Sequence, residues 1–220
     1  MKTIVITGIS RGIGRALAER FLENGDFVIG TSTSGTSPIE HDRLLTLQLD
    51  LTNPENIDTC TKAIIDSGKR IDILINNAGI WSGIDENPTI DIGLLRKTLE
   101  VNLFGTIEFT ERIIPIMNQG GHIVNVSSRM GSLEYCEKGG INWPDYKISK
   151  AALNMVTKIL AGRLAGNITA SSVHPGWVKT DMGGSDADIE PEEAAEDIFK
   201  LAVSKPKSGQ FWFKGEKFPW

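Results

Sequence analysis

The chain has 220 residues, 40% of them hydrophobic and 23% charged. These values predict one globular domain over residues 1–220, with a core large enough to need neither a disulfide nor a metal. The net charge of −5 gives no reason to expect nucleic acid or an anionic membrane as a partner. Two widely spaced cysteines and three scattered histidines predict no metal site and a reducing, cytoplasmic location. The apolar N-terminal run is too short for a signal peptide or a membrane span.

Strand-like and helix-like segments alternate along the chain. Runs of β-branched residues predict strands at residues 3–7, 26–31, 44–50, 71–76, 122–127, 168–174 and 210–213. Helical spacing of apolar residues predicts helices at residues 12–24, 54–67, 91–117, 146–165 and 191–202. This alternation predicts an α/β fold, a single Rossmann-type doubly wound domain with about seven mainly parallel strands. Ligands of such sheets bind beyond the carboxyl ends of the strands.

The loop after the first predicted strand, TGISRGIG at residues 7–14, is rich in glycine. Glycines let the backbone approach a pyrophosphate, and the helix that follows offers free N–H groups and a positive dipole end. An ordinary tight turn would also use glycines, but the position between strand and helix favours a dinucleotide site. The candidate contacts are Gly8, Ser10, Arg11, Gly12, Ile13 and Gly14.

The end of the second predicted strand, residues 30–34, has no acidic residue. An NAD site usually has a carboxylate there for the adenosine ribose. Small hydroxyl side chains such as Thr33 leave room for a 2′-phosphate, and Arg11 supplies a fixed positive charge. We therefore expect NADP(H) to be preferred, with NAD(H) as the alternative cofactor. Arg11 could equally be a solvated surface charge.

Tyr146 and Lys150 lie four residues apart on a predicted helix and so share one face. A tyrosine phenol is protonated at pH 7, and a neighbouring ammonium is expected to lower its pKa. Such a phenol could donate a proton to a carbonyl oxygen as a hydride arrives at the carbon. Alone, a Tyr/Lys pair at this spacing usually belongs to a helix surface, so its interpretation depends on the surroundings.

Polar and small residues follow the other predicted strands. A hydroxyl within residues 125–128 could bind the substrate oxygen beside the phenol, and the turn at residues 76–79 would admit a cofactor closely. Asp50 could accept the adenine amino group. Asn102 lies in a long predicted helix, where an amide is a mediocre helix former, and it could be a surface or packing residue.

Seven short motifs, in this order, resemble the short-chain dehydrogenase/reductase family over essentially the whole chain. They are TGISRGIG at 7–14, DL at 50–51, NNAG at 76–79, VN at 101–102, NVSS at 125–128, YKISK at 146–150 and PGWVKT at 175–180.

The resemblance implies a role for each catalytic candidate. Tyr146 would be the general acid/base, and Lys150 would hold the nicotinamide ribose and lower the Tyr146 pKa. Ser128, the second serine of its pair, would orient the substrate carbonyl, and Asn102 would hold a water that links Lys150 to solvent.

The resemblance also implies the remaining cofactor contacts. Ser10, Arg11 and Thr33 resemble the 2′-phosphate contacts of NADPH-using members. Asp50 and Leu51 would contact adenine, and Asn77 and Gly79 the adenosine side of the cofactor. Val178 and Thr180 would contact the nicotinamide carboxamide. Further cofactor contacts would be Ala78, Pro175 and Gly176.

Two features depart from the family pattern. Tyr146 follows Ser128 by 146 − 128 = 18 positions, a few more than is common, so residues 134–143 look like an insertion over the pocket. This resembles the carbonyl-reductase branch, and the insertion could obstruct the surface through which members form homodimers or homotetramers. The second departure is a short candidate lid at residues 183–190.

Three tryptophans, Trp81, Trp143 and Trp177, should lie on the cofactor edge of the sheet. They predict an apolar pocket for a hydrophobic or aromatic carbonyl substrate, although simple packing of loops would explain them as well. The expected function is therefore an NADPH-dependent reductase of a ketone or aldehyde. The alternatives are an NAD-dependent alcohol dehydrogenase, an epimerase or dehydratase relative, and a cofactor-binding regulatory protein with little turnover.

Overall fold

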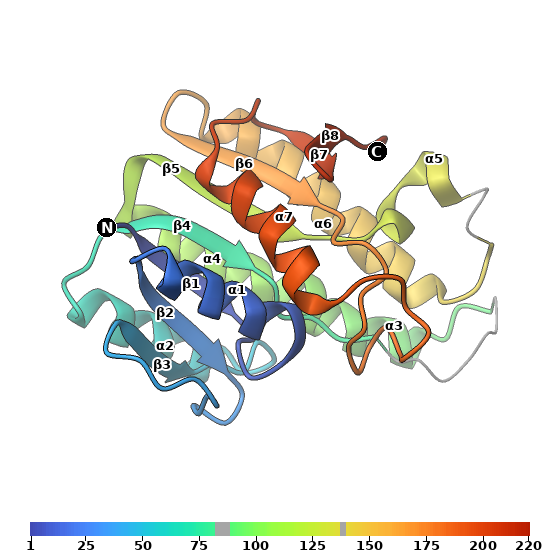
Figure 1. Ribbon diagram of the computed structural model, residues 1–220. Coiled ribbons are helices and arrows are strands. Elements are labelled where there is room, and N and C mark those ends of the chain that lie inside the picture. Colours follow the sequence, from blue (N-terminus) through green and yellow to red (C-terminus); the bar gives the residue numbers. More distant parts are fainter. Residues whose placement is uncertain (82–88, 137–139) are drawn as a thin grey trace.

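One sheet runs through the computed structural model, which describes residues 1–81, 89–136 and 140–220 (Figure 1). Within these residues the order of the eight strands is β3-β2-β1-β4-β5-β6-β7-β8. The strands are β1 (Thr3–Thr7), β2 (Phe27–Ser32), β3 (Leu44–Gln48), β4 (Ile71–Asn76), β5 (Met117–Val126), β6 (Ile168–Val173), β7 (Gln210–Phe213) and β8 (Glu216–Lys217). All neighbours pair in parallel except β7 and β8. The predicted doubly wound α/β fold is confirmed, and the additional strand is the two-residue β8.

Helices cover both faces of the sheet, as Figure 1 shows. On one face lie α1 (Gly12–Glu23) and α7 (Pro191–Val203). On the other face lie α2 (Pro54–Asp66), α4 (Thr106–Ile113) and α6 (Pro144–Arg163). Because apolar side chains fill both interfaces, the central strands are nearly continuous in hydrophobic residues.

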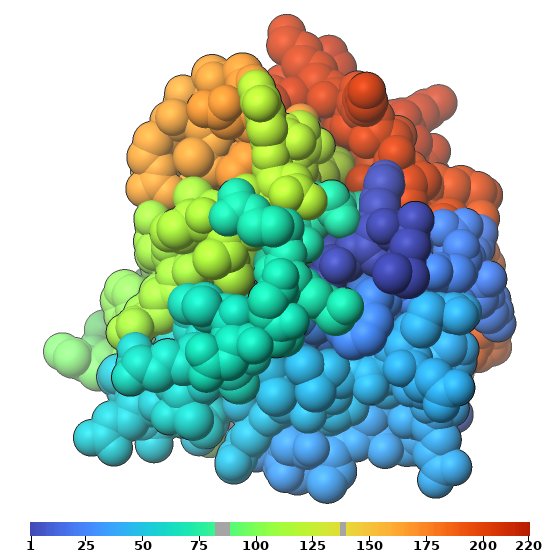
Figure 2. Space-filling view, turned by 90° about the vertical axis from the view of Figure 1, so that its left-hand side faces the viewer, coloured from blue at the N-terminus to red at the C-terminus, as the bar shows by residue number. Residues whose placement is uncertain are grey.

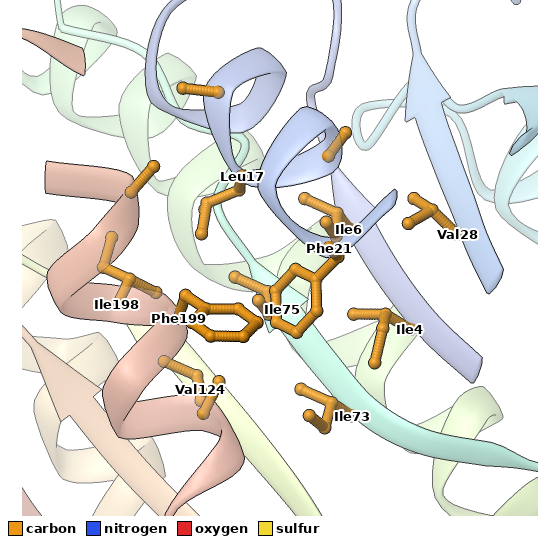
Figure 3. Packing of buried hydrophobic residues seen from close by; sticks show 14 of the residues in the cluster. Ile4, Ile6, Leu17, Phe21, Val28, Ile73, Ile75, Val124, Ile198 and Phe199 are labelled. Carbon is orange, nitrogen blue, oxygen red and sulfur yellow. The ribbon is translucent and has the colours of Figure 1, made fainter. Parts of the chain in front are cut away.

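The core on the α1 and α7 face is built around two aromatic rings (Figure 3). Phe21 of α1 and Phe199 of α7 meet edge to face, with their centroids 4.9 Å apart. Ile4 and Ile6 of β1 are fully buried beneath them. Burial of each such side chain contributes about 1.5–3 kcal/mol to stability.

The predicted helix at residues 91–117 is not continuous. It consists of α3 (Ile92–Leu99), the π-helical η1 (Glu100–Gly105), α4 and the 3₁₀ turn η2 (Ile114–Ile116). Pro115, which has no backbone N–H, lies in η2, and β5 begins directly afterwards. Helix α6 starts two residues earlier than predicted, because Pro144 occupies its first turn.

The winding of the chain reverses between β1 and β4, which are neighbours in the sheet. A cleft outside the carboxyl ends of the strands is expected at this place. These ends point to the right in Figure 1. Figure 2 views the opposite edge, where the N-terminal residues (dark blue) lie near the start of β5 (yellow-green). In the described part of the chain no helix combines the length and the apolar character that crossing a bilayer requires.

Candidate active site

The glycine loop between β1 and α1 is held by backbone contacts that leave no room for side chains. The N–H groups of Gly8 and Ile9 both donate to Thr31 O at 2.9 Å. A Cβ on Gly14 would lie 2.0 Å from Gly8 O. The Asn77 amide Nδ2 donates to Thr7 O at 2.9 Å and so ties the NNAG turn to this loop. The glycine loop and the NNAG turn are therefore packed against each other at the carboxyl edge of the sheet.

The first turn of α1 has the features of an anion site. The capping residue, Arg11, makes no side-chain cap hydrogen bond, and no acidic side chain occupies the first turn. The free N–H groups and the helix dipole therefore favour a negatively charged group. A Cβ on Gly12 would lie 3.0 Å from the Thr180 methyl group, so the PGWVKT segment closes the other side. Together with Gly14, this cradle fits a dinucleotide pyrophosphate.

The predicted 2′-phosphate contacts lie on the surface beside the loop. Arg11 Nη1 pairs with Asp181 Oδ2 at 2.8 Å, and the two side chains are 78% and 72% exposed. Because such exposed pairs contribute only about 0–1 kcal/mol, a phosphate could replace Asp181 at small cost. Thr33 and Ser10 are also exposed. The Thr33 carbonyl accepts from Gln48 Nε2 at 3.0 Å.

The predicted adenine contacts follow β3. Asp50 Oδ1 accepts from Thr52 N at 2.9 Å and from Thr52 Oγ1 at 2.7 Å, which fixes its carboxylate. Leu51 is buried, and a Cβ on Gly105 would lie 1.9 Å from its carbonyl oxygen. Gly105 therefore allows the π-helix to pass directly against the backbone of Leu51, in the segment that follows β3.

Asn102 lies on the π-helix η1, a rare conformation that is frequent at functional sites. Its Oδ1 accepts from Ile80 N at 2.8 Å, and its Nδ2 donates to Ile80 O at 2.9 Å and to Ser149 Oγ at 3.1 Å. This amide therefore binds the loop after β4 to α6. Gly79 lies beside it, because an added Cβ would be 3.1 Å from Asn102 Oδ1 and 3.5 Å from Lys150 Nζ.

Tyr146 and Lys150 lie on the buried face of α6. Lys150 Nζ is 5.6 Å from the Tyr146 ring centroid and donates to Val126 O at 2.9 Å. Burial lowers the pKa of Lys150 to about 8. Burial also raises the pKa of Tyr146 to about 12, against the opposing effect of a hydrogen bond with Ser128.

Burial has the largest effect on the Tyr146 pKa in this structure and raises it, while the expected lowering by Lys150 stays a prediction. The phenolate loses its hydration in the buried site, and this loss outweighs the stabilisation by neighbouring groups. Tyr146 is therefore fully protonated at pH 7, which is the state of a proton donor.

The two adjacent serines at the end of β5 point to different partners. Ser128 hydrogen-bonds Tyr146, and its Oγ accepts from Met130 N at 3.2 Å. Ser127 is buried, and its Oγ lies 3.4 Å from Lys150 O. Both serines line the cavity at Tyr146, and the preference for Ser128 as the group that orients the carbonyl stays a prediction.

A cavity of about 400 Å³ opens at Tyr146 and Ser128. Ile13, Pro175, Gly176, Val178 and Thr180, all expected to contact cofactor, line it as well. So do Trp81, Trp143 and Trp177. The rings of Trp81 and Trp143 meet edge to face at 5.6 Å.

Trp143 adopts a left-handed backbone conformation with φ of 56°. Such a conformation costs a bulky residue about 1–3 kcal/mol and occurs mostly at functional sites. It places Trp143 at the start of α6, three residues before Tyr146. Sequence reasoning placed this residue in the insertion but could not detect its backbone strain.

The remaining cavity wall comes from residues that the sequence did not single out, Arg129, Met130, His174 and Met182. Each of them follows β5 or β6 or lies near the candidate lid, and this position in the chain is the only feature of the sequence that could have indicated them.

The candidate lid at residues 183–190 is folded back onto Trp177. The Trp177 Nε1 donates to Gly183 O at 2.8 Å, and the Trp177 carbonyl accepts from the N–H groups of Asp188 and Ile189. In the insertion, α5 (Leu133–Cys136) is tied to the C-terminus by Glu134 N–H donating to Trp220 O at 3.1 Å. Residues 137–139 of the insertion lie outside the described residues.

Comparison with known proteins places this site in a family context. The family model described as short chain dehydrogenase matches residues 2–190. A 3-oxoacyl-(acyl-carrier-protein) reductase FabG of Vibrio cholerae is 35% identical over 194 residues, 82% of this chain and 75% of that protein. The structure of NADPH-bound carbonyl reductase from chicken fatty liver matches with a TM-score of 0.91, 25% identity, and coverage of 100% of this chain and 94% of that one. Carbonyl reductase Sniffer of D. melanogaster matches with a TM-score of 0.87 and 28% identity over 100% of both chains.

Proposed function

We propose that this chain, which belongs to the short chain dehydrogenase family of oxidoreductases, is an NADPH-dependent reductase. Its reaction would convert a ketone or aldehyde to an alcohol. One observation carries the proposal. Tyr146 is buried, protonated at pH 7 and hydrogen-bonded to Ser128, at a cavity that also meets the glycine loop through Ile13. A proton donor beside a dinucleotide cradle suits hydride transfer to a carbonyl group.

The cofactor would lie along the carboxyl edge of the sheet. The glycine loop and the first turn of α1 would bind its pyrophosphate, and Asp50 with Leu51 its adenine. The NNAG turn would contact the adenosine, Lys150 the nicotinamide ribose, and Val178 with Thr180 the carboxamide. When bound, the reduced nicotinamide supplies the hydride.

The protein supplies the proton and the charge environment. Tyr146 Oη donates its proton to the carbonyl oxygen as the carbon gains the hydride, so that the ketone becomes an alcohol. The Ser128 hydroxyl donates a hydrogen bond to the same oxygen and orients it. The Lys150 ammonium, 5.6 Å from the ring, stabilises the phenolate that remains. Asn102 keeps α6 and the loop after β4 in register by its three hydrogen bonds.

Replacement of the phenol tests the mechanism. General acid catalysis is worth about 10²- to 10⁴-fold, so Tyr146→Phe should lower kcat for ketone reduction by at least 100-fold. NADPH consumption at 340 nm with a panel of ketones and aldehydes measures it. NADPH affinity from tryptophan fluorescence should stay within a few-fold, which shows that the variant is folded. Full activity of Tyr146→Phe would refute the proposed acid.

The cofactor preference depends on Arg11. We expect Arg11→Gln to weaken NADPH binding about tenfold and NADH binding little, since only NADPH carries the 2′-phosphate. Arg15→Gln is the matched control, because Arg15 is another exposed arginine of this region and pairs with Glu19 at 2.9 Å. Equal affinity of the wild-type protein for the two cofactors would contradict this assignment.

The three tryptophans support an apolar or aromatic carbonyl substrate. We expect Trp81→Ala, Trp143→Ala and Trp177→Ala to raise KM for aromatic ketones several-fold, with smaller effects on acetone-sized substrates. Unchanged KM values for aromatic ketones and aldehydes in all three variants would mean that these side chains only pack the loops.

A further inference from the structure

A second, smaller cavity of about 180 Å³ adjoins the catalytic cavity. The two cavities share four lining residues, Arg129, His174, Gly176 and Trp177. Arg129 directly follows Ser128, so its backbone is fixed beside the group that orients the carbonyl. A substrate whose carbonyl lies at Tyr146 therefore has a defined space for a second group.

Arg129 is the cation of the shared wall. Its guanidinium carbon lies 5.4 Å from the ring centroid of Tyr135. Within residues 1–81, 89–136 and 140–220 it makes no side-chain hydrogen bond and no ion pair. Other arginines of the chain do pair with carboxylates, namely Arg11, Arg15, Arg20, Arg112 and Arg163. An arginine held at a cavity wall with its donors unused is suited to an anion that arrives from outside.

Among the described residues that line the second cavity, Arg129 is the positively charged side chain that has no carboxylate partner. His174 is neutral at pH 7, since burial and the nearby Arg129 charge lower its pKa to about 3. Lys214 is engaged by Glu193 at 3.1 Å. Asp188 is the one carboxylate among the described lining residues of both cavities, and it is exposed at the surface.

We propose that Arg129 binds the carboxylate of the substrate, so that the preferred substrates are oxo acids with an apolar or aromatic body. The guanidinium fork matches a carboxylate with two parallel hydrogen bonds. The body of the substrate fills the tryptophan-lined cavity while the carboxylate lies at the wall between the cavities. This proposal rests on the reductase activity proposed above and adds the substrate class to it.

The test compares an acid with its neutral ester. The probes are 4-oxo-4-phenylbutanoate and its methyl ester, which share the ketone and the ring and differ in the charge. Wild-type protein should reduce the acid with a kcat/KM at least tenfold higher than the ester. Arg129→Gln should lower this acid-to-ester ratio by about 10- to 100-fold, the usual value of a hydrogen-bonded charge.

A matched control is Arg163→Gln. Arg163 pairs with Glu111 at 2.7 Å and lies at the far end of α6 from Tyr146, about 25 Å along the helix. Its replacement should leave the acid-to-ester ratio at the wild-type value. Equal use of acid and ester by the wild-type protein, or an unchanged ratio in Arg129→Gln, would overturn the role of Arg129.

Binding measurements separate this inference from the reductase activity. If NADPH is not consumed with either probe, the proposed activity toward such ketones fails. The quenching of tryptophan fluorescence by the acid then decides about Arg129 alone. Binding of the acid at least tenfold weaker in Arg129→Gln than in wild type supports the carboxylate site, and equal binding refutes it.

Discussion

Asn102 and Ser149, 47 residues apart in the chain, meet through a hydrogen bond of 3.1 Å from Nδ2 to Oγ. Ser149 Oγ in turn donates to Tyr146 O at 2.7 Å. The π-helix is thus bonded to the first turns of α6, within one turn of the phenol. We expect the position of Tyr146 to depend on this link, because loss of either buried side chain would leave a polar group without its partner.

A double-mutant cycle should detect this link as coupling in stability. Asn102→Ala removes the three hydrogen bonds of a buried side chain and should lower the free energy of unfolding by about 2–3 kcal/mol. Ser149→Ala should cost about 1 kcal/mol, and the double variant about 1 kcal/mol less than the sum. Urea unfolding followed by tryptophan fluorescence measures all three. Strict additivity would show that the two side chains do not stabilise each other.

The pH dependence of reduction should report Lys150. Its pKa is lowered to about 8, so the ammonium is charged below pH 8 and loses its charge as the pH rises through that value. Tyr146, with a pKa near 12, stays protonated over this range. We therefore expect kcat/KM for reduction to fall above pH 8, because the developing phenolate loses its neighbouring charge.

Lys150→Arg should shift this alkaline decline upward by at least one pH unit, since an arginine remains charged. Lys158→Arg makes the same exchange two turns further along α6, where Lys158 Nζ donates to Gly209 O at 3.3 Å. Its pH profile should match that of the wild type. A decline that stays at pH 8 in Lys150→Arg would assign it to another group.

Acidification should destabilise the protein through His122. Burial lowers the pKa of His122 to about 4, so the ring is neutral in the fold, with its nitrogens 2.9 Å from Ser171 Oγ and 3.2 Å from Ala202 O. The unfolded chain binds a proton below about pH 6.5, so this stability is present above pH 6.5 and is lost as the pH falls toward 4. Between pH 6.5 and 5 the loss amounts to about 2 kcal/mol.

His122→Gln should remove this part of the acid sensitivity, whatever it does to stability at pH 7.5. His41→Gln is the control, because His41 is exposed and its Nδ1 accepts only from Arg43 N at 3.0 Å. Urea midpoints at pH 7.5 and pH 5 give the comparison. An equal loss in wild type and His122→Gln would contradict the prediction.

Two glycine-to-alanine exchanges should differ in outcome, since one should weaken NADPH binding and the other should stabilise the fold. Gly14→Ala places a Cβ 2.0 Å from Gly8 O, so the glycine loop must shift and NADPH binding should weaken at least 100-fold. Gly162 lies in α6, and apart from its own stretch of helix no heavy atom of the described residues lies within 4 Å of an added Cβ. Gly162→Ala should raise the free energy of unfolding by about 0.5–1 kcal/mol, since alanine favours the helix. Normal NADPH affinity in Gly14→Ala would exclude the loop as the pyrophosphate site.

The sequence alone determined the layout of the molecule and the edge where its chemistry lies. Hydrophobic periodicity sets the alternation of strands and helices, and parallel strands necessarily bring their carboxyl ends to one edge. For that reason the sequence alone predicts that the turns at 7–14, 76–79 and 125–128 lie together. The spacing of Tyr146 and Lys150 put them on one helix face by the same local rule.

Only the tertiary structure decided the features that depend on burial and on contacts between distant segments. The Tyr146 pKa is raised because neighbouring residues exclude water from the phenol, and no local sequence pattern predicts this burial. The π-helix around Asn102 and the left-handed Trp143 are conformations that packing imposes against local preference. Arg129 lines both cavities, at a place where residues that follow β5 and β6 meet the C-terminal strands. Because these segments are far apart in the sequence, only the folded chain shows this position of Arg129.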